Sequence, residues 1–569
     1  MKPAHSYLLA AAGWVLFIIF VPTISAQEAT LPRPTGVPQD WSQRHIVYSR
    51  AALAEHPEIM EREPRVLHQE MQRWQAPDGN GFAGVEPHAI ARKSPTHRDW
   101  NVIMGGRVAP DMFPSKYVFD PSLPPDCTRD YVVFGLASTN TPGGTTPPAN
   151  LVAFNNLYVD GTGTAFCAGT GGPPWPTQPN TLFAYNITTV AGGRIKTSPV
   201  LSLDGTKIAF VESVQTAPVQ TIFHVLTWTA GAGTIAAPAV PTSMTNLLVS
   251  GTAVDSYASP WVDYDSDTAY VGTDDGKVYQ IKPVFGGTPA LTGGNWPIQV
   301  TNRQLTNPVL DSTLGKLLVG SVNGYLFQID TALGVLGPNL QVGLTGSPNN
   351  PGIYAGPIVD ITSGTAFVVS PNGVDKIGVA TKSAVLVQVD IATMTEMSEA
   401  KIGQGASVTK LKLYEPALDN NYYNGLATGM IHLCGTGPGD TSPYQYAFGF
   451  TAGVMNTVFT TRQQLLTSPN ARCTGWTEFY NPNKGVAGTD FFFFGLSQDC
   501  YPPGNSGVAH GCVEALSSDP TIPTAFAQIS SGPTGIIIDN YSTAVAASSL
   551  YFTANGKNTA YKFTQDGLR

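Results

Sequence analysis

A short motif returns along most of the chain, and its spacing limits the folds that the chain can adopt. The motif is a turn residue, often Pro, followed by two apolar residues and an acid. Clear copies read SPWVD (259–263), NPVLD (307–311), GPIVD (356–360) and EPALD (415–419). Looser copies are SKYVFD (115–120), SPVLSLD (198–204), GWTEF (475–479) and GIIID (535–539). The last seven copies are roughly 48 to 61 residues apart, which indicates a repeat architecture.

Each copy is followed by further β-rich runs. The second run of a unit reads KIAFVES, TAYVGT, KLLVGS, TAFVVS or SLYFTA, and the third reads KVYQIK, YLFQID, VLVQVD or AYKFTQ. With a weaker fourth strand, each unit would form a four-stranded sheet, which is typical of a β-propeller blade. We count eight units, so the sequence predicts an all-β fold with one large eight-bladed propeller. Seven blades is the alternative if the first unit is misread.

The segment DFFFFGL (490–496) tests this interpretation, because four consecutive phenylalanines do not fit a strand with one solvated face. The segment aligns with DYVVFGL (130–136), at the second-strand position of its unit. Propeller blades pack face to face, and strands that are buried on both faces read as continuous apolar runs. We therefore expect Phe491 and Phe493 to face one neighbouring blade, and Phe492 and Phe494 to face the other.

The composition agrees with many short strands and excludes one class of partner. Charged residues make up 12% of the chain, about half the roughly 25% of typical domains. Gly (59) and Pro (46) supply turns, and the 42% of hydrophobic residues argues against disorder. The net charge of −9, without a basic cluster, argues against nucleic acid as a partner.

The N-terminus resembles a secretory signal. Residues 7–20 are apolar, and TISA offers Ala26 as the residue before cleavage, so residues 1–26 are predicted to be a signal peptide. Gln27 would start the mature chain, and because it is not Cys no lipid anchor is expected. No later segment approaches the ~20 apolar residues that a membrane span needs. We expect a secreted protein, periplasmic or extracellular, with no membrane span in the mature chain.

Residues 27–110 carry a much higher share of charged residues than the rest and form a predicted N-terminal extension, followed by the propeller over 111–569. Residues 57–74 favour helix, in which Leu67, Met71 and Trp74 would make one apolar stripe. The extension is either packed on the propeller or a partner-binding arm. The eighth unit has only three visible strands, and DWNVIMGG (99–106) is the predicted donor of its missing outer strand.

Six cysteines fit an exported protein, and in an oxidising compartment they are expected to form disulfides. Six cysteines allow 15 pairings. Proximity along the chain favours Cys127 with Cys167, Cys434 with Cys473, and Cys500 with Cys512.

The acids that end the motif would form a ring in the propeller: Asp120, Asp263, Asp311, Asp360, Asp419, Glu478 and Asp539. A cation site or an acid–base pair is one interpretation. The structural interpretation is favoured, because an Asp at a strand end accepts hydrogen bonds from the following turn. DYDSD (263–267) has acids at alternate positions like a calcium loop, but Thr268 stands where such a loop needs Gly, so a hairpin turn is predicted. No metal site is predicted.

The repeats resemble the PQQ-type and WD40-like repeats of secreted bacterial β-propellers. TDDGKVYQI (273–281) and SVNGYLFQID (321–330) resemble the PQQ-repeat core, and LSLDGTKIAFVES (201–213) resembles the repeat of TolB-like propellers. The chain is also similar to a group of secreted, multi-disulfide bacterial propellers without an assigned activity. The quinoprotein dehydrogenases among these families hold pyrroloquinoline quinone and Ca²⁺. Their adjacent-cysteine disulfide and tryptophan-docking repeats do not occur here, so no catalytic residue is carried over.

The resulting prediction is a secreted, non-catalytic propeller that binds or scaffolds through its channel mouth and face loops. A protein or a glycan is the expected partner class, and no cofactor is expected. The first alternative is a quinoprotein-like oxidoreductase with a diverged site, dependent on pyrroloquinoline quinone and calcium. The second is a structural component of the cell envelope, motivated by the low charge and the disulfides.

Overall fold

A computed structural model describes residues 36–74, 96–168, 173–253, 256–344, 352–374, 383–405, 411–469, 471–484, 488–500, 510–519, 525–542 and 544–565. All of them belong to one compact unit, Pro34–Arg569. The predicted signal peptide lies outside the described residues. No helix in the described part of the chain is long and apolar enough to cross a membrane.

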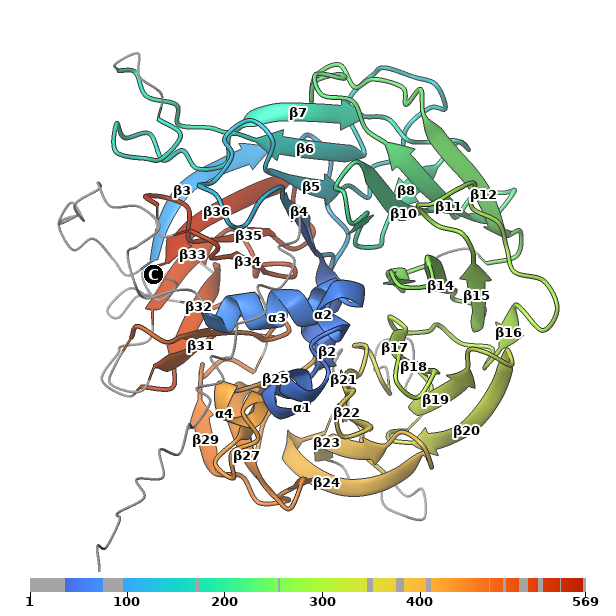
Figure 1. Cartoon of the computed structure of the whole chain (residues 1–569), viewed down its shortest axis with the longest axis vertical. Coiled ribbons are helices and arrows are strands. Elements are labelled where there is room, and N and C mark those ends of the chain that lie inside the picture. The colour runs from blue at the N-terminus through green and yellow to red at the C-terminus, as the bar shows by residue number, and fades with distance from the viewer. Residues whose placement is uncertain are drawn as a thin grey trace, which may run out of the picture. The chain divides into compact units, whose positions relative to one another are not determined.

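Eight mainly antiparallel sheets follow one another around a common central axis, which confirms an eight-bladed propeller (Figure 1). From inner to outer strand, the first four blades contain β4 (Ser115–Val118), β5 (Tyr131–Gly135), β6 (Leu151–Asn155) and β7 (Asn180–Tyr185); β9 (Val200–Leu201), β10 (Lys207–Val214), β11 (Gln220–Thr227) and β12 (Met244–Ser250), with β8 (Gly193–Ile195) also on β10; β13 (Trp261–Asp263), β14 (Thr268–Gly272), β15 (Lys277–Ile281) and β16 (Ile298–Gln299); and β17 (Val309–Asp311), β18 (Lys316–Gly320), β19 (Tyr325–Asp330) and β20 (Val335–Gln341). The last four contain β21 (Ile358–Asp360), β22 (Thr365–Ser370), β23 (Ser383–Asp390) and β24 (Thr395–Gln404); β25 (Ala417–Leu418), β26 (Met430–Thr436) and β27 (Pro443–Thr451), which pairs with β28 (Val454–Met455) and β29 (Thr461–Gln464); β30 (Thr477–Asn481), β31 (Thr489–Leu496), β32 (Gly511–Ser517) and β33 (Ala525–Ile529); and β34 (Ile537–Asp539), β35 (Ser549–Thr553), β36 (Thr559–Gln565) and β3 (Thr96–Ile103).

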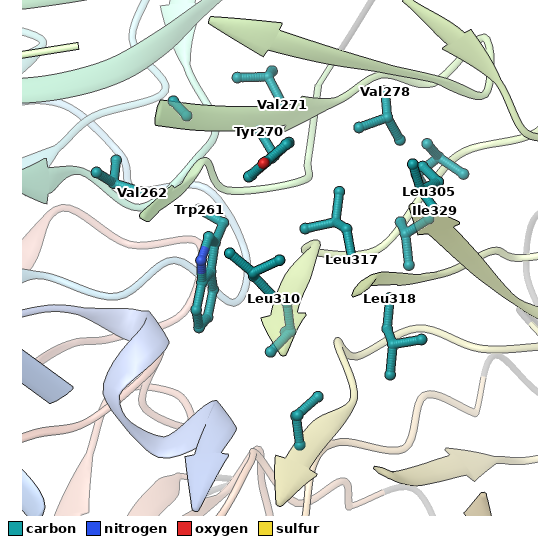
Figure 2. Packing of buried hydrophobic residues seen from close by; sticks show 14 of the residues in the cluster. Trp261, Val262, Tyr270, Val271, Val278, Leu305, Leu310, Leu317, Leu318 and Ile329 are labelled. Atoms are coloured by element: carbon teal, nitrogen blue, oxygen red, sulfur yellow. The ribbon is translucent and has the colours of Figure 1, made fainter. Parts of the chain in front are cut away.

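The core lies between the faces of neighbouring blades. Figure 2 shows side chains of the third and fourth blades meeting, among them Trp261 and Tyr270 from one and Leu310 and Leu317 from the other. The second strand of a blade is covered on both sides, which explains its continuous apolar sequence.

The four phenylalanines of β31 are buried as expected, with between 0 and 3% of their surface exposed. Phe491 and Phe493 belong to a core cluster with residues of the eighth blade such as Leu550. Phe492 and Phe494 belong to another cluster, with Trp476 and residues of the sixth blade. The indole of Trp476 stacks on the ring of Phe494, with the centroids 4.4 Å apart. The prediction that alternate rings face opposite neighbours is confirmed.

The ring is closed by a strand from the N-terminal side of the chain. β3 pairs antiparallel with β36, with Ile103 opposite Thr559, and supplies the outer strand of the eighth blade. This is the role that the sequence predicts for residues 99–106. Asp99 of β3 also forms a buried ion pair with Lys562 of β36.

Residues 36–74 fill one end of the channel, and we call them the plug. They form β1 (Val37–Gln39), a 3₁₀ turn (Trp41–His45), β2 (Ile46–Val47), α1 (Arg50–Glu55), α2 (Ile59–Arg62) and α3 (Pro64–Trp74). β1 pairs antiparallel with β4, the inner strand of the first blade. β2 pairs parallel with β21, the inner strand of the fifth. The helices lie at the centre of the ring in Figure 1, so within the described residues the extension is packed on the propeller rather than forming a free arm.

The buried residues of α3 are mostly polar, which the apolar stripe did not predict. Leu67 and Met71 are partly exposed, and the structure does not describe the side chain of Trp74. Its buried residues are Pro64, Arg65, Val66, His68, Gln69, Glu70, Gln72 and Arg73. The helix lies against strand ends that offer backbone carbonyls and carboxylates, so polar side chains find partners there.

Candidate functional site

Three arginines of the plug reach into the channel wall. Arg44 pairs with Glu415, and Arg73 pairs with Glu478 at 2.5 Å. The guanidinium of Arg65 pairs with Glu63 of the plug itself and donates to the carbonyl of Val262 at 2.8 Å. These contacts fix the plug to the third, sixth and seventh blades.

The other end of the channel is a pocket, which we call the mouth. Its walls are the segments that precede the inner strands of all eight blades, and its floor is Arg44 of the plug lying over the ring of Phe113, 3.9 Å from its centroid. The empty space is about 700 Å³ when the part open to solvent is counted.

A carboxylate from one side of the mouth holds two tyrosines from the other. Asp111 lies in the segment between β3 and β4. Tyr354 precedes β21 and Tyr414 precedes β25. The hydroxyls of Tyr354 and Tyr414 donate to the two oxygens of Asp111, each at 2.7 Å. Their rings meet edge to face, with centroids 5.6 Å apart.

Lys412 completes this cluster. Its ammonium donates to the Tyr354 hydroxyl at 2.5 Å, lies 3.5 Å from an Asp111 oxygen, and lies 3.8 Å from the centroid of the Tyr354 ring. Asp111 has φ of 65°, a conformation that is uncommon for residues other than glycine. Backbone strain of this kind is concentrated at functional sites, where the surroundings hold it in place.

The segments that precede the inner strands of the second, third and fourth blades offer an aromatic face and amides to the mouth. Lys196 donates to the hydroxyl of Tyr257 at 3.1 Å and lies over its ring, and Tyr257 is 38% exposed. The oxygen of the Asn307 amide accepts from the backbone of Ser259 at 2.7 Å. Among the described residues, neither the Asn307 NH₂ nor the side-chain amide of Gln304 has a hydrogen-bond partner.

Burial shifts the proton equilibria of the mouth. Burial raises the pKa of Tyr354 and Tyr414 well above the usual value, and the Asp111 charge adds to the shift. Both tyrosines are therefore hydrogen-bond donors at neutral pH. Burial lowers the pKa of Arg44 to about 10, against the opposing attraction of Glu415, which leaves Arg44 charged at pH 7.

The seven strand-end acids take two different roles, and none lines the mouth. Asp311 accepts from the backbone N–H groups of Thr313 and Leu314, at 3.0 and 2.9 Å. Asp120, Asp263, Asp360 and Asp419 accept from backbone N–H groups of the following turn in the same manner. Glu478 and Asp539 instead form ion pairs, with Arg73 and Lys116. DYDSD is the turn of the hairpin between β13 and β14, as predicted.

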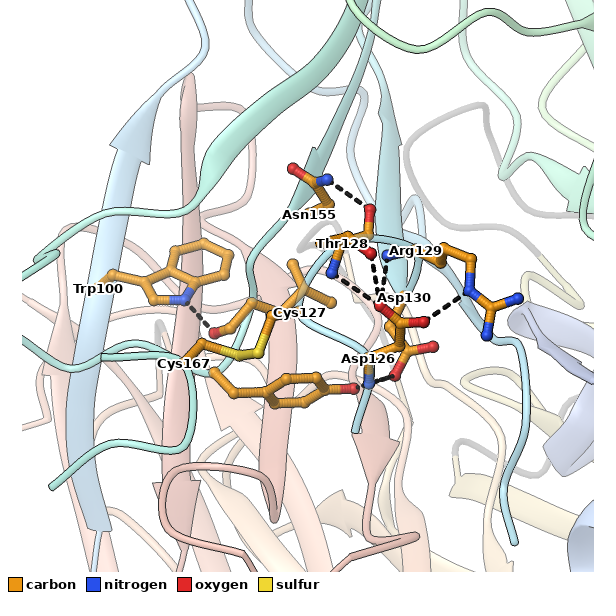
Figure 3. The surroundings of a disulfide bond; sticks show 10 residues. Trp100, Asp126, Cys127, Thr128, Arg129, Asp130, Asn155 and Cys167 are labelled. Carbon is orange, nitrogen blue, oxygen red and sulfur yellow. Dashed lines mark hydrogen bonds and ion pairs between the residues drawn. A yellow bond between two sulfur atoms is a disulfide. The ribbon is translucent and has the colours of Figure 1, made fainter. Parts of the chain in front are cut away.

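The cysteines form the bonds expected from proximity: Cys127–Cys167, Cys434–Cys473 and Cys500–Cys512. Figure 3 shows the first, beside Trp100 of β3 and the turn at Asp126. Asp126 caps that turn through the backbone of Thr128, at 2.9 Å. Three disulfides indicate an oxidising environment.

The donor set of the mouth does not fit pyrroloquinoline quinone with Ca²⁺. Ca²⁺ takes about six to eight oxygen ligands, mostly carboxylates and carbonyls. The carboxylates among the described lining residues are Asp111 and Glu415, and each is already held by a cation. Elsewhere in the described chain, Cys500, Cys512 and Glu514 lie together, but the two sulfurs are bonded to each other.

No protein-family model matches the chain, and no curated protein matches it. Three solved structures resemble it over most of its length. BamB from Moraxella catarrhalis is 13% identical, with a TM-score of 0.43, over 82% of this chain and 97% of that one. The Dos1 propeller is 12% identical, with a TM-score of 0.44, over 83% and 96%. The WD40 β-propeller domain of Doa1 is 10% identical, with a TM-score of 0.37, over 83% and 98%.

Proposed function

We propose that this protein is a secreted, non-catalytic binding propeller that takes its ligand at the mouth. The observation that carries the proposal is the plug. It occupies one end of the channel, so the mouth becomes a blind pocket with a fixed floor. Concave sites lined by aromatic groups and a few placed polar groups are where proteins bind small ligands and chain ends.

The mouth is organised for binding rather than for chemistry. The charges of Arg44 and Glu415 pair with each other, and those of Lys412 and Asp111 do the same. Nucleophilic catalysis needs a nucleophile within hydrogen-bond reach of a base. The described lining residues include no Ser–His or Cys–His pair. Such paired, mutually held groups present a rigid surface, which lowers the entropy lost on binding.

The disulfides and the signal-like N-terminus support secretion. Disulfides persist in oxidising compartments and are rare in the cytosol. A scaffold outside the cytoplasm also fits the low proportion of charged residues.

Binding at the mouth is testable with ligand libraries. The full chain would be secreted from an oxidising host and applied to glycan and peptide arrays, beside the variant Tyr257→Ala. The control is Phe459→Ala, because Phe459 is also 38% exposed and precedes β29 in the sixth blade. We expect a ligand whose binding is lost in Tyr257→Ala and kept in the control. The proposal is wrong if every ligand binds both variants equally.

A further inference from the structure

The geometry points to a neutral sugar residue, at the end of a glycan, as the ligand of the mouth. This inference rests on the proposed binding function and adds the chemical class of the ligand. It follows from the charge balance, the uncommitted hydrogen-bonding groups and the blind shape of the pocket.

The charge balance disfavours a charged ligand. The three cations of the described lining already have partners: Lys412 has Asp111, Arg44 has Glu415, and Lys196 has the hydroxyl and ring of Tyr257. A carboxylate ligand would compete with these partners, and an ammonium ligand would compete with Lys412 and Arg44 for the two carboxylates. Either replacement leaves one protein charge in the pocket without its partner, which is costly in a partly desolvated site. A neutral ligand leaves both pairs intact.

The groups that remain suit hydroxyls. A sugar hydroxyl both donates and accepts, so its best partners are groups with both capacities, such as amides and hydroxyls. The amide of Gln304 and the NH₂ of Asn307 have no partner among the described residues, and the Tyr257 hydroxyl accepts from Lys196 while its own proton stays available.

The aromatic groups suit the other surface of a sugar. One face of a pyranose ring presents C–H groups, which pack on the electron-rich face of an aromatic ring. Tyr257 is 38% exposed at the mouth, and Lys196 positions its ring. Tyr354 and Tyr414 line the same pocket and are held by Asp111, so little of their side-chain entropy is lost when a ligand packs against them.

The shape selects a chain end. The floor formed by Arg44 and Phe113 prevents a polymer from passing through the channel. An extended peptide would instead gain most from pairing with the edge of an inner strand. At the first and fifth blades the plug already pairs with those edges, through β1 and β2.

The test uses purified oligosaccharides with the full disulfide-bonded chain. Neutral and acidic glycans of matched length are measured by isothermal titration calorimetry against wild type, Gln304→Ala/Asn307→Ala, and Gln464→Ala as an exposed amide control on β29. We expect a neutral glycan to bind wild type and the control equally. The double variant should bind it at least ten-fold more weakly.

A second pair of variants keeps the test decisive if the double variant does not fold. Tyr257→Phe keeps the stacking face and should keep most of the affinity for the neutral glycan, whereas Tyr257→Ala should lose it. Binding only to acidic glycans, or only to peptides, with the same dependence on Tyr257 would overturn the sugar inference and leave the binding function standing. Absence of any ligand that depends on Tyr257 would overturn both.

Discussion

Lys116 of β4 and Asp539 of β34 form a buried ion pair, 2.8 Å apart, that joins the first blade to the last. The side chains are 0% and 4% exposed. Removing one partner of a buried pair leaves a charge that is neither solvated nor paired, which destabilises a protein by about 3–5 kcal/mol. We expect Lys116→Ala to lower the free energy of unfolding by that amount, measured by urea denaturation.

The matched control for this pair is Lys316→Ala. Lys316 lies 2.8 Å from Asp330 with both side chains about a quarter exposed, and such pairs contribute about 0–1 kcal/mol. The double variant Lys116→Met/Asp539→Leu removes both charges and should recover most of the lost stability. If Lys116→Ala and Lys316→Ala lower the free energy of unfolding by the same amount, the pair between the blades contributes no more than an exposed pair.

The phenylalanines of β31 hold the seventh blade to both neighbours. Phe494 is fully buried and stacked on Trp476, so Phe494→Ala should destabilise the protein by about 3–5 kcal/mol. Phe459→Ala removes a ring of the same size that is 38% exposed, so it should destabilise the protein clearly less than Phe494→Ala does. Thermal unfolding of both variants checks the difference, and a small effect at Phe494 contradicts the double-sided packing.

His68 makes the plug sensitive to acid. Burial lowers the pKa of His68 to about 3, and the nearby charges of Arg73 and Lys116 add to the shift. The unfolded chain binds this proton below about pH 6.5, where a free histidine titrates, and the folded chain does not. The stability from neutral His68 is therefore complete above pH 6.5 and falls toward pH 3, at up to about 1.4 kcal/mol per pH unit.

The variant His68→Gln should show a smaller loss of melting temperature between pH 7 and pH 4 than wild type. His56→Gln is the control, because His56 is exposed on the surface of the plug, and its profile should follow wild type. Identical profiles for all three proteins contradict the assignment.

Glu514 should act in the opposite direction. It lies 3.7 Å from Cys512 Sγ, and burial raises its pKa to about 7. The folded state keeps a proton that the unfolded chain releases near pH 4.5. The stability from protonated Glu514 is complete below that pH and is lost as the pH rises through about 7. Glu514→Gln should therefore be more stable than wild type at pH 8.5 and nearly equal at pH 4.5. Glu61→Gln, an exposed acid on α2, should change neither value.

Local patterns in the sequence predicted the blades. The candidate site could not be predicted, because its residues come together only in the folded chain. The burial of DFFFFGL could be predicted, because a strand that is covered on both faces has a continuous apolar sequence. The strands of the plug could not, since β1 and β2 have three and two residues and exist only through their pairing with β4 and β21. A charged residue such as Arg73 is normally predicted to be exposed to solvent. Here Arg73 is buried, because Glu478 of the channel wall pairs with it.

The mouth was missed for a related reason. Asp111 meets Tyr354 and Tyr414 across 243 and 303 residues of chain, and no spacing rule connects positions so distant. The repeat itself could have indicated the site, although weakly. A propeller brings the positions just before each motif together at one end of its channel.

The pairing of β3 with β36 closes the ring, and it also determines how late in synthesis the fold can be completed. Lys562 follows Asp99 by 463 residues, so a chain that is synthesised from its N-terminus presents β3 long before β36. Until then both edges of the future last blade are open to other chains, and unpaired edges are where aggregation begins. Loss of residues 559–565 would leave the sequences of all earlier blades intact. It would remove β36, so β3 could not pair and the propeller could not close. We therefore expect such a truncated chain to be degraded or to aggregate, because the last blade lacks its partner strand.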